Sequence, residues 1–169
     1  MKISWWKNIL LFIILILCQV WVLNQVHLFN LITPLLYVYF ILKLSAGMNR
    51  NAVIVWSFFI GFCVDIFNNT LGLNALASTI AGFFRYYLLN LTMSREENAY
   101  IPSAKTMNMP GFMRYALFLV LLHHVILFSV EAFSVISYEI VLLKIVGSVT
   151  LTLILIYSLE SLHFEPLEV

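Results

Sequence analysis

The sequence predicts an all-α integral membrane protein that folds as one six-transmembrane-helix bundle over residues 1–169. Hydrophobic residues make up 63% of the chain and charged residues only 10%, whereas a soluble domain is about half apolar and about a quarter charged. The apolar residues gather in six segments, most of them close to the roughly 17–25 residues that a helix needs to cross a bilayer. The basic residues fall almost entirely on one side of these segments.

The six expected spans cover about residues 8–24, 31–47, 51–67, 71–91, 113–134 and 138–159. Turn-forming sequences separate several of them, at residues 30–34, 47–50, 68–70 and 134–138. The first span follows Lys2 and Lys7, as a secretory signal would, but no small-residue cleavage motif comes after it. We therefore expect it to remain as a membrane helix.

The basic residues predict the orientation. Six spans place eight of the nine in the same half of the bilayer or beside it: Lys2, Lys7, Lys43, Arg50, Arg85, Arg95, Lys105 and Arg114. Only Lys144 falls in the other half. Because cytoplasmic loops carry the excess of Lys and Arg, we expect both termini in the cytoplasm. Removing one span would scatter the basic residues over both faces, so the same distribution supports the count of six.

Polar groups interrupt the apolar pattern at residues 61–85. Charge at membrane depth is costly, so an acidic side chain there needs a physical reason. Asp65 lies two residues from the outer end of the third span. Either it is interfacial, reaching lipid headgroups or capping the turn of Asn68, Asn69 and Thr70, or it faces the bundle and binds a polar group or a partner helix.

The fourth span has a face of small and polar residues. Asn74, Ser78, Ala81, Gly82 and Arg85 recur at helical spacing. Such a face lets another helix approach closely and lets amides hydrogen-bond across the contact. That helix belongs either to the same bundle, as ordinary intramolecular packing, or to a partner. The side chain of Arg85 also has the length to reach the cytoplasmic headgroups.

The fifth span contains His123, His124 and Glu131. Seven residues separate His124 from Glu131, which places them on nearly one face but about 10 Å apart along the axis. This distance is too large for a direct pair or for joint metal ligation, and adjacent histidines point about 100° apart on a helix. We therefore expect no metal site and keep His124 as a candidate polar contact.

Depth suggests an ion pair between the last two spans. Glu131 lies near the outer end of the fifth span, and Lys144 lies six residues into the sixth span from the same side. An antiparallel hairpin would bring the two side chains together, and pairing lowers the cost of burying both charges. We predict a pair between Glu131 and Lys144, with Asp65 as a possible third member.

The sequence shows no catalytic motif. It contains no Gly-rich phosphate loop, no His-Glu-x-x-His, no Gly-x-Ser-x-Gly and no Cys-x-x-Cys-His. Cys18 and Cys63 lie in apolar runs, where cysteine usually acts as a small hydrophobe. The basic residues are too scattered for a nucleic-acid surface. We expect a protein that is not an enzyme and that holds no catalytic residue, cofactor or metal.

Two short patterns occur in a fixed order. The first, at residues 61–77, is Gly-x-x-x-Asp and then Leu-Gly-Leu-Asn-Ala-Leu-Ala; the second, at residues 122–133, is Leu-His-His-Val-Ile-Leu-Phe and then Glu-Ala-Phe. With the size, the six spans and the cytoplasmic ends, they resemble the MreD family of bacterial rod shape-determining proteins over nearly the whole chain. The family's Gly-Thr-Pro-Leu-Gly turn is Asn-Thr-Leu-Gly at residues 69–72, without the proline.

The resemblance implies a non-enzymatic scaffold of the cell-wall elongation machinery in the bacterial inner (cytoplasmic) membrane. Family members bind the bitopic protein MreC and connect through it to the peptidoglycan polymerase–transpeptidase pair and to MreB filaments. Membrane lipids, and no nucleic acid, are the other expected partners. The family is also similar in fold to the substrate-binding subunits of energy-coupling-factor transporters. The alternative is therefore a small-molecule-binding transporter subunit, with an outward cavity lined by Asp65, Asn68, Asn69, Glu131 and Lys144.

Overall fold

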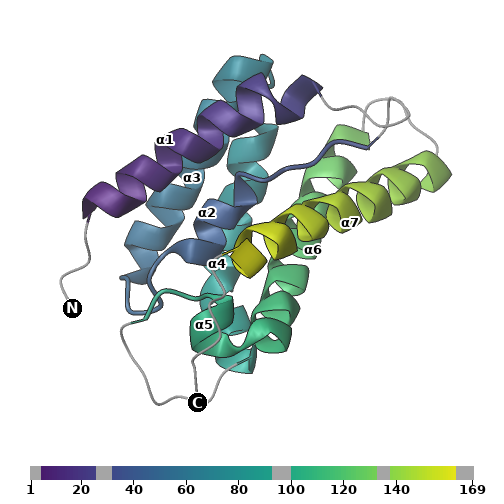
Figure 1. Ribbon diagram of the computed structural model, residues 1–169. Helices are drawn as coiled ribbons and strands as arrows, with labels where there is room; N and C mark the ends of the chain where they lie inside the picture. The colour runs from purple at the N-terminus through teal and green to yellow at the C-terminus, as the bar shows by residue number, and fades with distance from the viewer. Residues whose placement is uncertain (1–4, 26–31, 93–99, 133–137, 163–169) are drawn as a thin grey trace.

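The computed structural model describes residues 5–25, 32–92, 100–132 and 138–162, and these residues form an all-helical bundle (Figure 1). The helices are α1 (Trp5–Trp21), a 3-10 turn (Leu23–Gln25), α2 (Val38–Lys43), α3 (Arg50–Asn68), α4 (Leu73–Thr92), α5 (Ala104–Met107), α6 (Met109–Ala132) and α7 (Tyr138–Leu162). Lys2 and Arg95, which enter the predicted orientation, lie outside the described residues, as do parts of the predicted breaks at 30–34 and 134–138.

Four helical stretches of the described chain are long and apolar enough to cross a membrane, which supports the expectation of a membrane protein. They are Trp6–Gln25, Arg50–Asn68, Met109–Ala132 and Glu139–Leu162. Helix α4 has 20 residues but is not among these four, because polar residues such as Asn74 and Arg85 interrupt its apolar sequence. Large apolar side chains are exposed on the outside of the bundle, as expected where lipid is the solvent.

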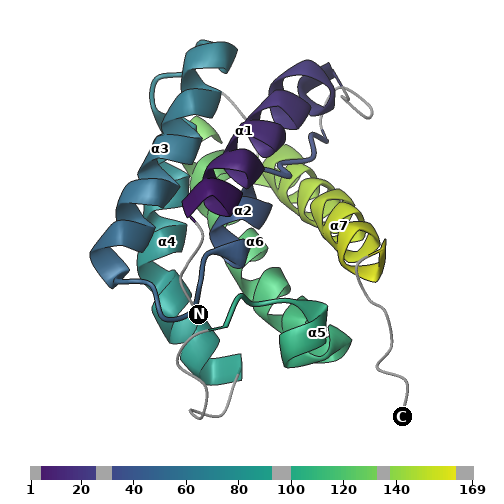
Figure 2. The same cartoon turned by 60° about the vertical axis from the view of Figure 1, so that its left-hand side comes forward.

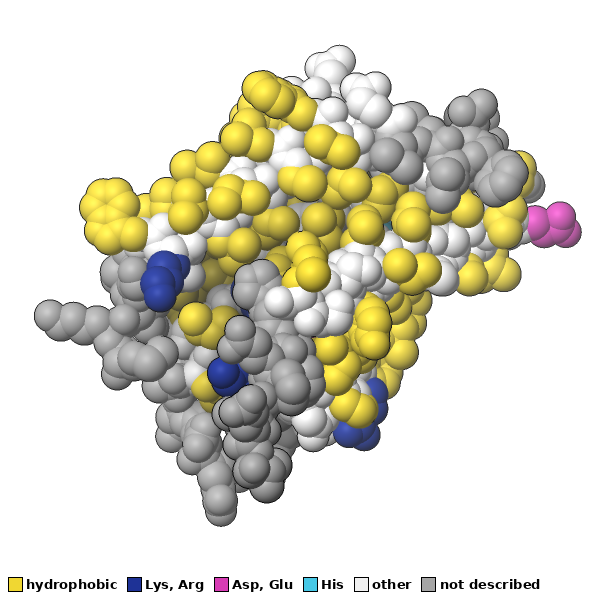
Figure 3. Space-filling view, viewed as in Figure 1, with side chains coloured by type: hydrophobic (Ala, Val, Ile, Leu, Met, Phe, Trp, Pro, Cys, Tyr) yellow, Lys and Arg dark blue, Asp and Glu magenta, His cyan; other side chains and the backbone are white. Residues whose placement is uncertain are grey.

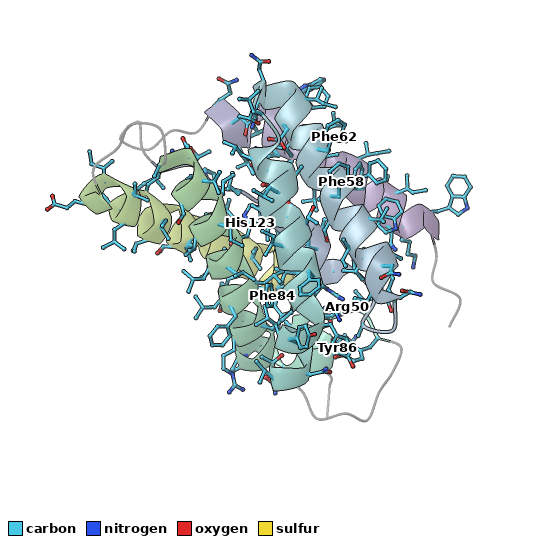
Figure 4. All side chains as sticks on the ribbon, turned by 180° about the vertical axis from the view of Figure 1, so that it is seen from behind. Arg50, Phe58, Phe62, Phe84, Tyr86 and His123 are labelled. Atoms are coloured by element: carbon cyan, nitrogen blue, oxygen red, sulfur yellow. The ribbon has the colours of Figure 1, made fainter. Side chains whose placement is uncertain are left out.

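Helix α4 lies at the centre of the packing. It packs against α3 on one side and α6 on the other, and α7 packs against α6 (Figures 1 and 2). The small and polar face predicted for this helix is buried: Asn74, Ser78, Ala81, Gly82 and Arg85. The neighbouring helices belong to the same chain, so the interpretation as intramolecular packing is confirmed for this face. Aromatic side chains such as Phe58 and Phe62 of α3 and Phe84 and Tyr86 of α4 remain exposed (Figure 4).

Two glycines allow α3 and α4 to lie close together. A Cβ added to Gly61 would come within 2.8 Å of the Cα of Ala75, and a Cβ added to Gly82 would come within 2.7 Å of the Cβ of Ser57. Real Cβ atoms do not approach other atoms so closely, so larger residues at either position would push the helices apart. These contacts are the small-residue packing typical of helix pairs in membranes.

The second expected span, residues 31–47, is not a continuous helix. Only Val38–Lys43 is helical, and the described residues before it are extended or in a turn. Pro34 is the physical reason: proline lacks a backbone N–H and disfavours helical geometry at the residue before it, which here is Thr33. Pro34 was expected to mark a break in the chain, yet the expected span from 31 to 47 included it. That part of the prediction was wrong.

This irregular segment is buried between α1 and α7 and against α4 and α6 (Figure 2). Its side chains from Tyr37 to Leu42 are almost fully buried. Backbone groups inside a membrane protein must be satisfied by the protein itself. Here side chains do so: Ser148 accepts from the N–H of Thr33 (3.2 Å), and Thr152 accepts from the N–H of Leu35 (3.1 Å).

Gln19 of α1 completes this arrangement. Its side-chain amide donates to the carbonyl of Pro34 (3.0 Å), and its side-chain oxygen accepts from the N–H of Tyr37 (3.4 Å). Gln19 is fully buried. The non-helical part of residues 32–37 is therefore held from two sides, by α1 and by α7, and it fixes the position of the Tyr37 side chain in the core.

Candidate functional site

The carboxylate of Asp65 caps the start of α4. Its Oδ1 accepts from the backbone N–H (3.1 Å) and side-chain amide (2.9 Å) of Asn74 and from the hydroxyl of Thr70, and its Oδ2 accepts from the N–H of Ala75 (2.7 Å). The first N–H groups of a helix lack partners within the helix, and the helix dipole favours negative charge there. Asp65 is only 3% exposed, so the interpretation as an interfacial group that reaches the headgroups is wrong. The carboxylate faces the bundle and binds the polar side chain of Asn74, as the second interpretation proposed, and it also binds the hydroxyl of Thr70 in the turn.

The turn after Asp65 depends on two residues with left-handed backbone geometry. Asn69 has a φ of 53° and donates its N–H to the carbonyl of Asp65, while Gly72 has a φ of 82°. Asn and Gly tolerate this geometry best, so the turn forms without the proline of the family pattern. Asn68 accepts a hydrogen bond from the side chain of Asn24, which links this turn to the 3-10 turn that follows α1.

Tyr37 connects this turn to α6. Its hydroxyl donates to the side-chain oxygen of Asn74 (2.8 Å) and lies 2.9 Å from Nε2 of His123, which Ser78 also approaches (3.3 Å). Because the Tyr37 proton is used on Asn74, Nε2 must carry the proton of a neutral His123. Asp65, Asn74, Tyr37 and His123 therefore form one continuous buried chain of hydrogen bonds. Figure 4 labels His123 in the interior of the bundle.

His124 faces a different neighbour from His123. Its Nδ1 lies 2.8 Å from the carbonyl of Val120, and its Nε2 lies 3.4 Å from the hydroxyl of Thr152. Nδ1 is therefore the protonated nitrogen, and Nε2 accepts from Thr152, whose oxygen in turn accepts from the N–H of Leu35. His124 thus helps to hold the irregular segment. Within the described residues, no cluster of three or more His, Cys, Asp or Glu side chains could hold a metal.

Arg85 caps the end of the short helix α2. Its Nε donates to the carbonyl of Ile41 (2.8 Å), and its Nη2 donates to the carbonyl of Leu44. The last carbonyls of a helix lack partners within the helix, and a cation is favourable at that end. Arg85 is only 2% exposed. The expectation that it extends to the headgroups is therefore wrong, and its charge is used inside the bundle.

Glu131 of α6 and Lys144 of α7 form the predicted ion pair. The Nζ of Lys144 lies 2.7 and 2.8 Å from the two carboxylate oxygens of Glu131, and it also sits 4.7 Å from the ring centre of Phe128. The pair is partly exposed, with 18% of the Lys144 side chain and 40% of the Glu131 side chain accessible. Asp65 is not a member, because its carboxylate oxygens are occupied by the turn and by α4.

A cavity of about 580 Å³, with both polar and apolar side chains in its lining, lies between this ion pair and the α3–α4 turn. The polar side chains that line it are Asn24, Thr33, Asn68, Thr70, Asn74, Glu131 and Lys144. Five residues were expected to line an outward cavity. Asn68, Glu131 and Lys144 line this one, whereas Asp65 and Asn69 do not. Asp65 still acts on the cavity, because it holds Thr70 and Asn74 in place.

The opposite end of the bundle has a buried acidic residue that the sequence analysis missed. Glu160 of α7 is 2% exposed and pairs with Lys43 of α2. It also accepts from the hydroxyl of Tyr39 (2.6 Å) and from the N–H of Ala104 at the start of α5 (2.8 Å). This carboxylate thus joins α2, α5 and α7.

Several other members of the buried network were also missed. Gln19 and Tyr37 were not selected, because each lies in an apolar run where a single polar residue carries little signal. His123 was not selected because only the fold shows which of the two adjacent histidines meets Tyr37. A usable signal was present, because Gln19 follows an uninterrupted apolar run near the end of α1 and a polar side chain in such a helix needs a buried polar partner.

Comparison with protein-family models, curated proteins and solved structures gave no significant match to this chain.

Proposed function

We propose that this chain is a multi-pass protein of the bacterial cytoplasmic membrane and a non-enzymatic scaffold of the MreD type. In this role it binds an MreC-like bitopic protein. Through that protein it is linked to MreB-like filaments and to the peptidoglycan polymerase–transpeptidase pair, and it supports cell shape and lateral wall synthesis.

One observation carries the proposal: the two sequence patterns that resemble the family meet in space. Asp65 and Asn74 belong to the first pattern and His123 to the second, and Tyr37 links them by hydrogen bonds. Gly61 of the first pattern makes the close contact between α3 and α4. Residues about fifty positions apart in the sequence thus build one core, as expected if the two patterns specify one fold.

The polar candidates also support a structural rather than a chemical role. Within the described chain, Asp65 caps α4, Arg85 caps α2, and Glu131 pairs with Lys144. Groups that are fully engaged in holding helices together are poor candidates for nucleophiles or proton donors, which need access to a substrate. A rigid polar core is what a scaffold needs in order to present a fixed outer surface.

The proposed topology has six crossings with both termini in the cytoplasm. The second crossing is the irregular segment that ends in α2, and the fourth is α4. The distribution of charge supports this arrangement, because Lys7, Lys43 and Lys105 line one cavity at the α5 end, whereas Lys144 lines the cavity beside the α3–α4 turn. The α5 end would face the cytoplasm.

The second candidate function is a ligand-binding subunit of a membrane transporter, of the kind found in energy-coupling-factor systems. The observation that favours it is the cavity of about 580 Å³ next to Lys144, which is large enough for a small molecule. Asn68, Asn74 and Glu131 would supply hydrogen-bond partners there. A paired ammonium and carboxylate suit a zwitterionic or polar ligand.

Depletion of the protein in its native host separates the two functions. A scaffold of wall elongation predicts cells that widen and round up, with restoration of normal width by the wild-type gene. Cells that keep their width but lose uptake of a nutrient would reject the scaffold and favour the transporter subunit. Neighbouring genes give an independent check: MreB- and MreC-like genes favour the scaffold, and a pair of transporter ATPases favours the alternative.

A further inference from the structure

A second cavity lies at the α5 end of the bundle, between α1, α2, α7 and the chain before α5. Its volume is about 470 Å³. Much of its wall is hydrocarbon, and the apolar side chains that form it are Leu11, Ile14, Leu15, Ile101 and Leu159. Figure 3 shows that the face of the molecule that carries α1 and α7 is largely hydrophobic, with Lys and Arg atoms at its left side and along its lower part.

Three lysines surround the polar end of this cavity: Lys7, Lys43 and Lys105. Glu160 is the acidic residue in the lining, and it is already engaged by Lys43, Tyr39 and the N–H of Ala104. The ion pairs found among the described residues are Lys43–Glu160 and Lys144–Glu131, so neither involves Lys7 or Lys105. The cavity therefore carries an excess of positive charge.

Asn8 supplies an independent indication of a ligand. It lines the same cavity and is only 8% exposed, yet its side-chain nitrogen has no hydrogen-bond partner among the described residues. A buried amide donor left without an acceptor is destabilising, and such groups are uncommon in native proteins. An acceptor bound in the cavity would remove this cost after a rotation of the Asn8 side chain that turns its amide toward the cavity.

We propose that this cavity binds the phosphate of an anionic phospholipid. The phosphate lies between Lys7 and Lys105 and accepts a hydrogen bond from Asn8, while an acyl chain runs along Leu11 and Leu15. The apolar wall favours a lipid over a soluble anion, because a soluble anion would leave this hydrocarbon surface in contact with water. Basic pockets between membrane helices on the cytoplasmic side are a known way of binding lipid headgroups. This inference does not depend on the scaffold proposal.

The test measures lipid binding to the full-length protein in detergent by native mass spectrometry, with phosphatidylglycerol and phosphatidylcholine in competition. We expect the wild-type protein to retain phosphatidylglycerol preferentially. Each neutralised lysine should weaken binding about fivefold, so Lys7→Gln with Lys105→Gln should weaken it about 25-fold. Arg114→Gln is the control, because Arg114 is an exposed cation of α6 that does not line the cavity.

The variant Asn8→Leu tests the hydrogen bond separately. Without anionic lipid it should be as stable as the wild type or more stable, because it removes an unpaired buried donor. With phosphatidylglycerol it should lose most of the thermal stabilisation that the wild type gains. If Asn8→Leu does not fold, the double lysine variant still tests the proposal. Both lysines are exposed, so their replacement should leave the fold intact.

Three outcomes would overturn the proposal. The first is equal retention of the two lipids by the wild-type protein. The second is unchanged binding of phosphatidylglycerol by the double lysine variant. The third is equal stabilisation by inorganic phosphate in phosphatidylcholine nanodiscs, which would identify a soluble anion as the ligand instead of a lipid.

Discussion

Asp65 and Asn74 join the end of α3 to the start of α4 through a single carboxylate oxygen. Oδ1 of Asp65 accepts both the backbone N–H and the side-chain amide of Asn74, at 3.1 and 2.9 Å. The side-chain oxygen of Asn74 in turn accepts a hydrogen bond from the hydroxyl of Tyr37, which extends the chain of hydrogen bonds. One buried charge therefore orders a helix cap and a hydrogen-bond chain that reaches α6.

The variant Asp65→Asn should lower the free energy of unfolding by about 2 kcal/mol, because it replaces charge-assisted hydrogen bonds and turns an NH₂ group toward backbone donors. Thermal unfolding in detergent measures this change. Glu139→Gln is the matched control, because Glu139 is an exposed carboxylate of α7. Equal melting temperatures for the wild type and both variants would show that the cap contributes nothing.

The close approach of α3 and α4 predicts different responses at its two glycines. Gly61→Ala should destabilise by about 1–3 kcal/mol, because the new methyl group meets the backbone of α4, which cannot rotate away. Gly82→Ala should also destabilise, but Ser57→Gly in the same chain should restore most of the loss, because Ser57 is the side chain in the way. Melting temperatures of Gly82→Ala, Ser57→Gly and the double variant test this. If the double variant is no more stable than Gly82→Ala, the side chain of Ser57 is not what opposes the larger residue.

Removal of the Tyr37 hydroxyl should lower the stability of the protein, whereas removal of an exposed hydroxyl should not. Tyr37→Phe leaves the ring in place but leaves the buried oxygen of Asn74 without the proton that it accepts, at a cost of about 1 kcal/mol. Tyr157→Phe removes a hydroxyl from a half-exposed tyrosine of α7 and should be neutral. If the two variants unfold at the same temperature, the buried hydrogen-bond chain does not stabilise the bundle.

The Glu131–Lys144 pair predicts rescue by exchange of charge. Glu131→Lys and Lys144→Glu should each lower stability, and the double variant should recover part of the loss. The coupling energy should be about 1 kcal/mol, the upper range for partly exposed pairs, and it should fall as salt is added. A double-mutant cycle from unfolding measurements gives this coupling. A double variant no better than the single variants would mean that the two charges do not interact.

The sequence predicted the helices with long apolar runs, because length and hydropathy alone identify them. It also predicted the ion pair between Glu131 and Lys144, because both residues lie near one end of an antiparallel hairpin. The buried face of α4 was predictable from helical spacing. These successes share a cause: each depends on periodicity or on depth along a helix, and both can be counted in a sequence.

The broken second span and the buried network were not predicted. Residues 32–37 leave helical geometry at Pro34 and are then held by Gln19, Ser148 and Thr152, which lie far away in the sequence. Such contacts depend on tertiary packing, which no local pattern records. His123 was passed over in favour of His124 for the same reason, because only the fold shows which of two adjacent rings meets Tyr37.

Capture of the tagged full-length protein from membranes of its native host, followed by identification of the proteins that come with it, tests the scaffold proposal. We expect an MreC-like bitopic protein to be enriched with the wild type. Asp65→Ala and Arg85→Ala should recover less of it than Leu142→Ala, because Leu142 is 63% exposed and supports no helix cap. Capture of folded wild-type protein without an MreC-like protein would rule out the scaffold function.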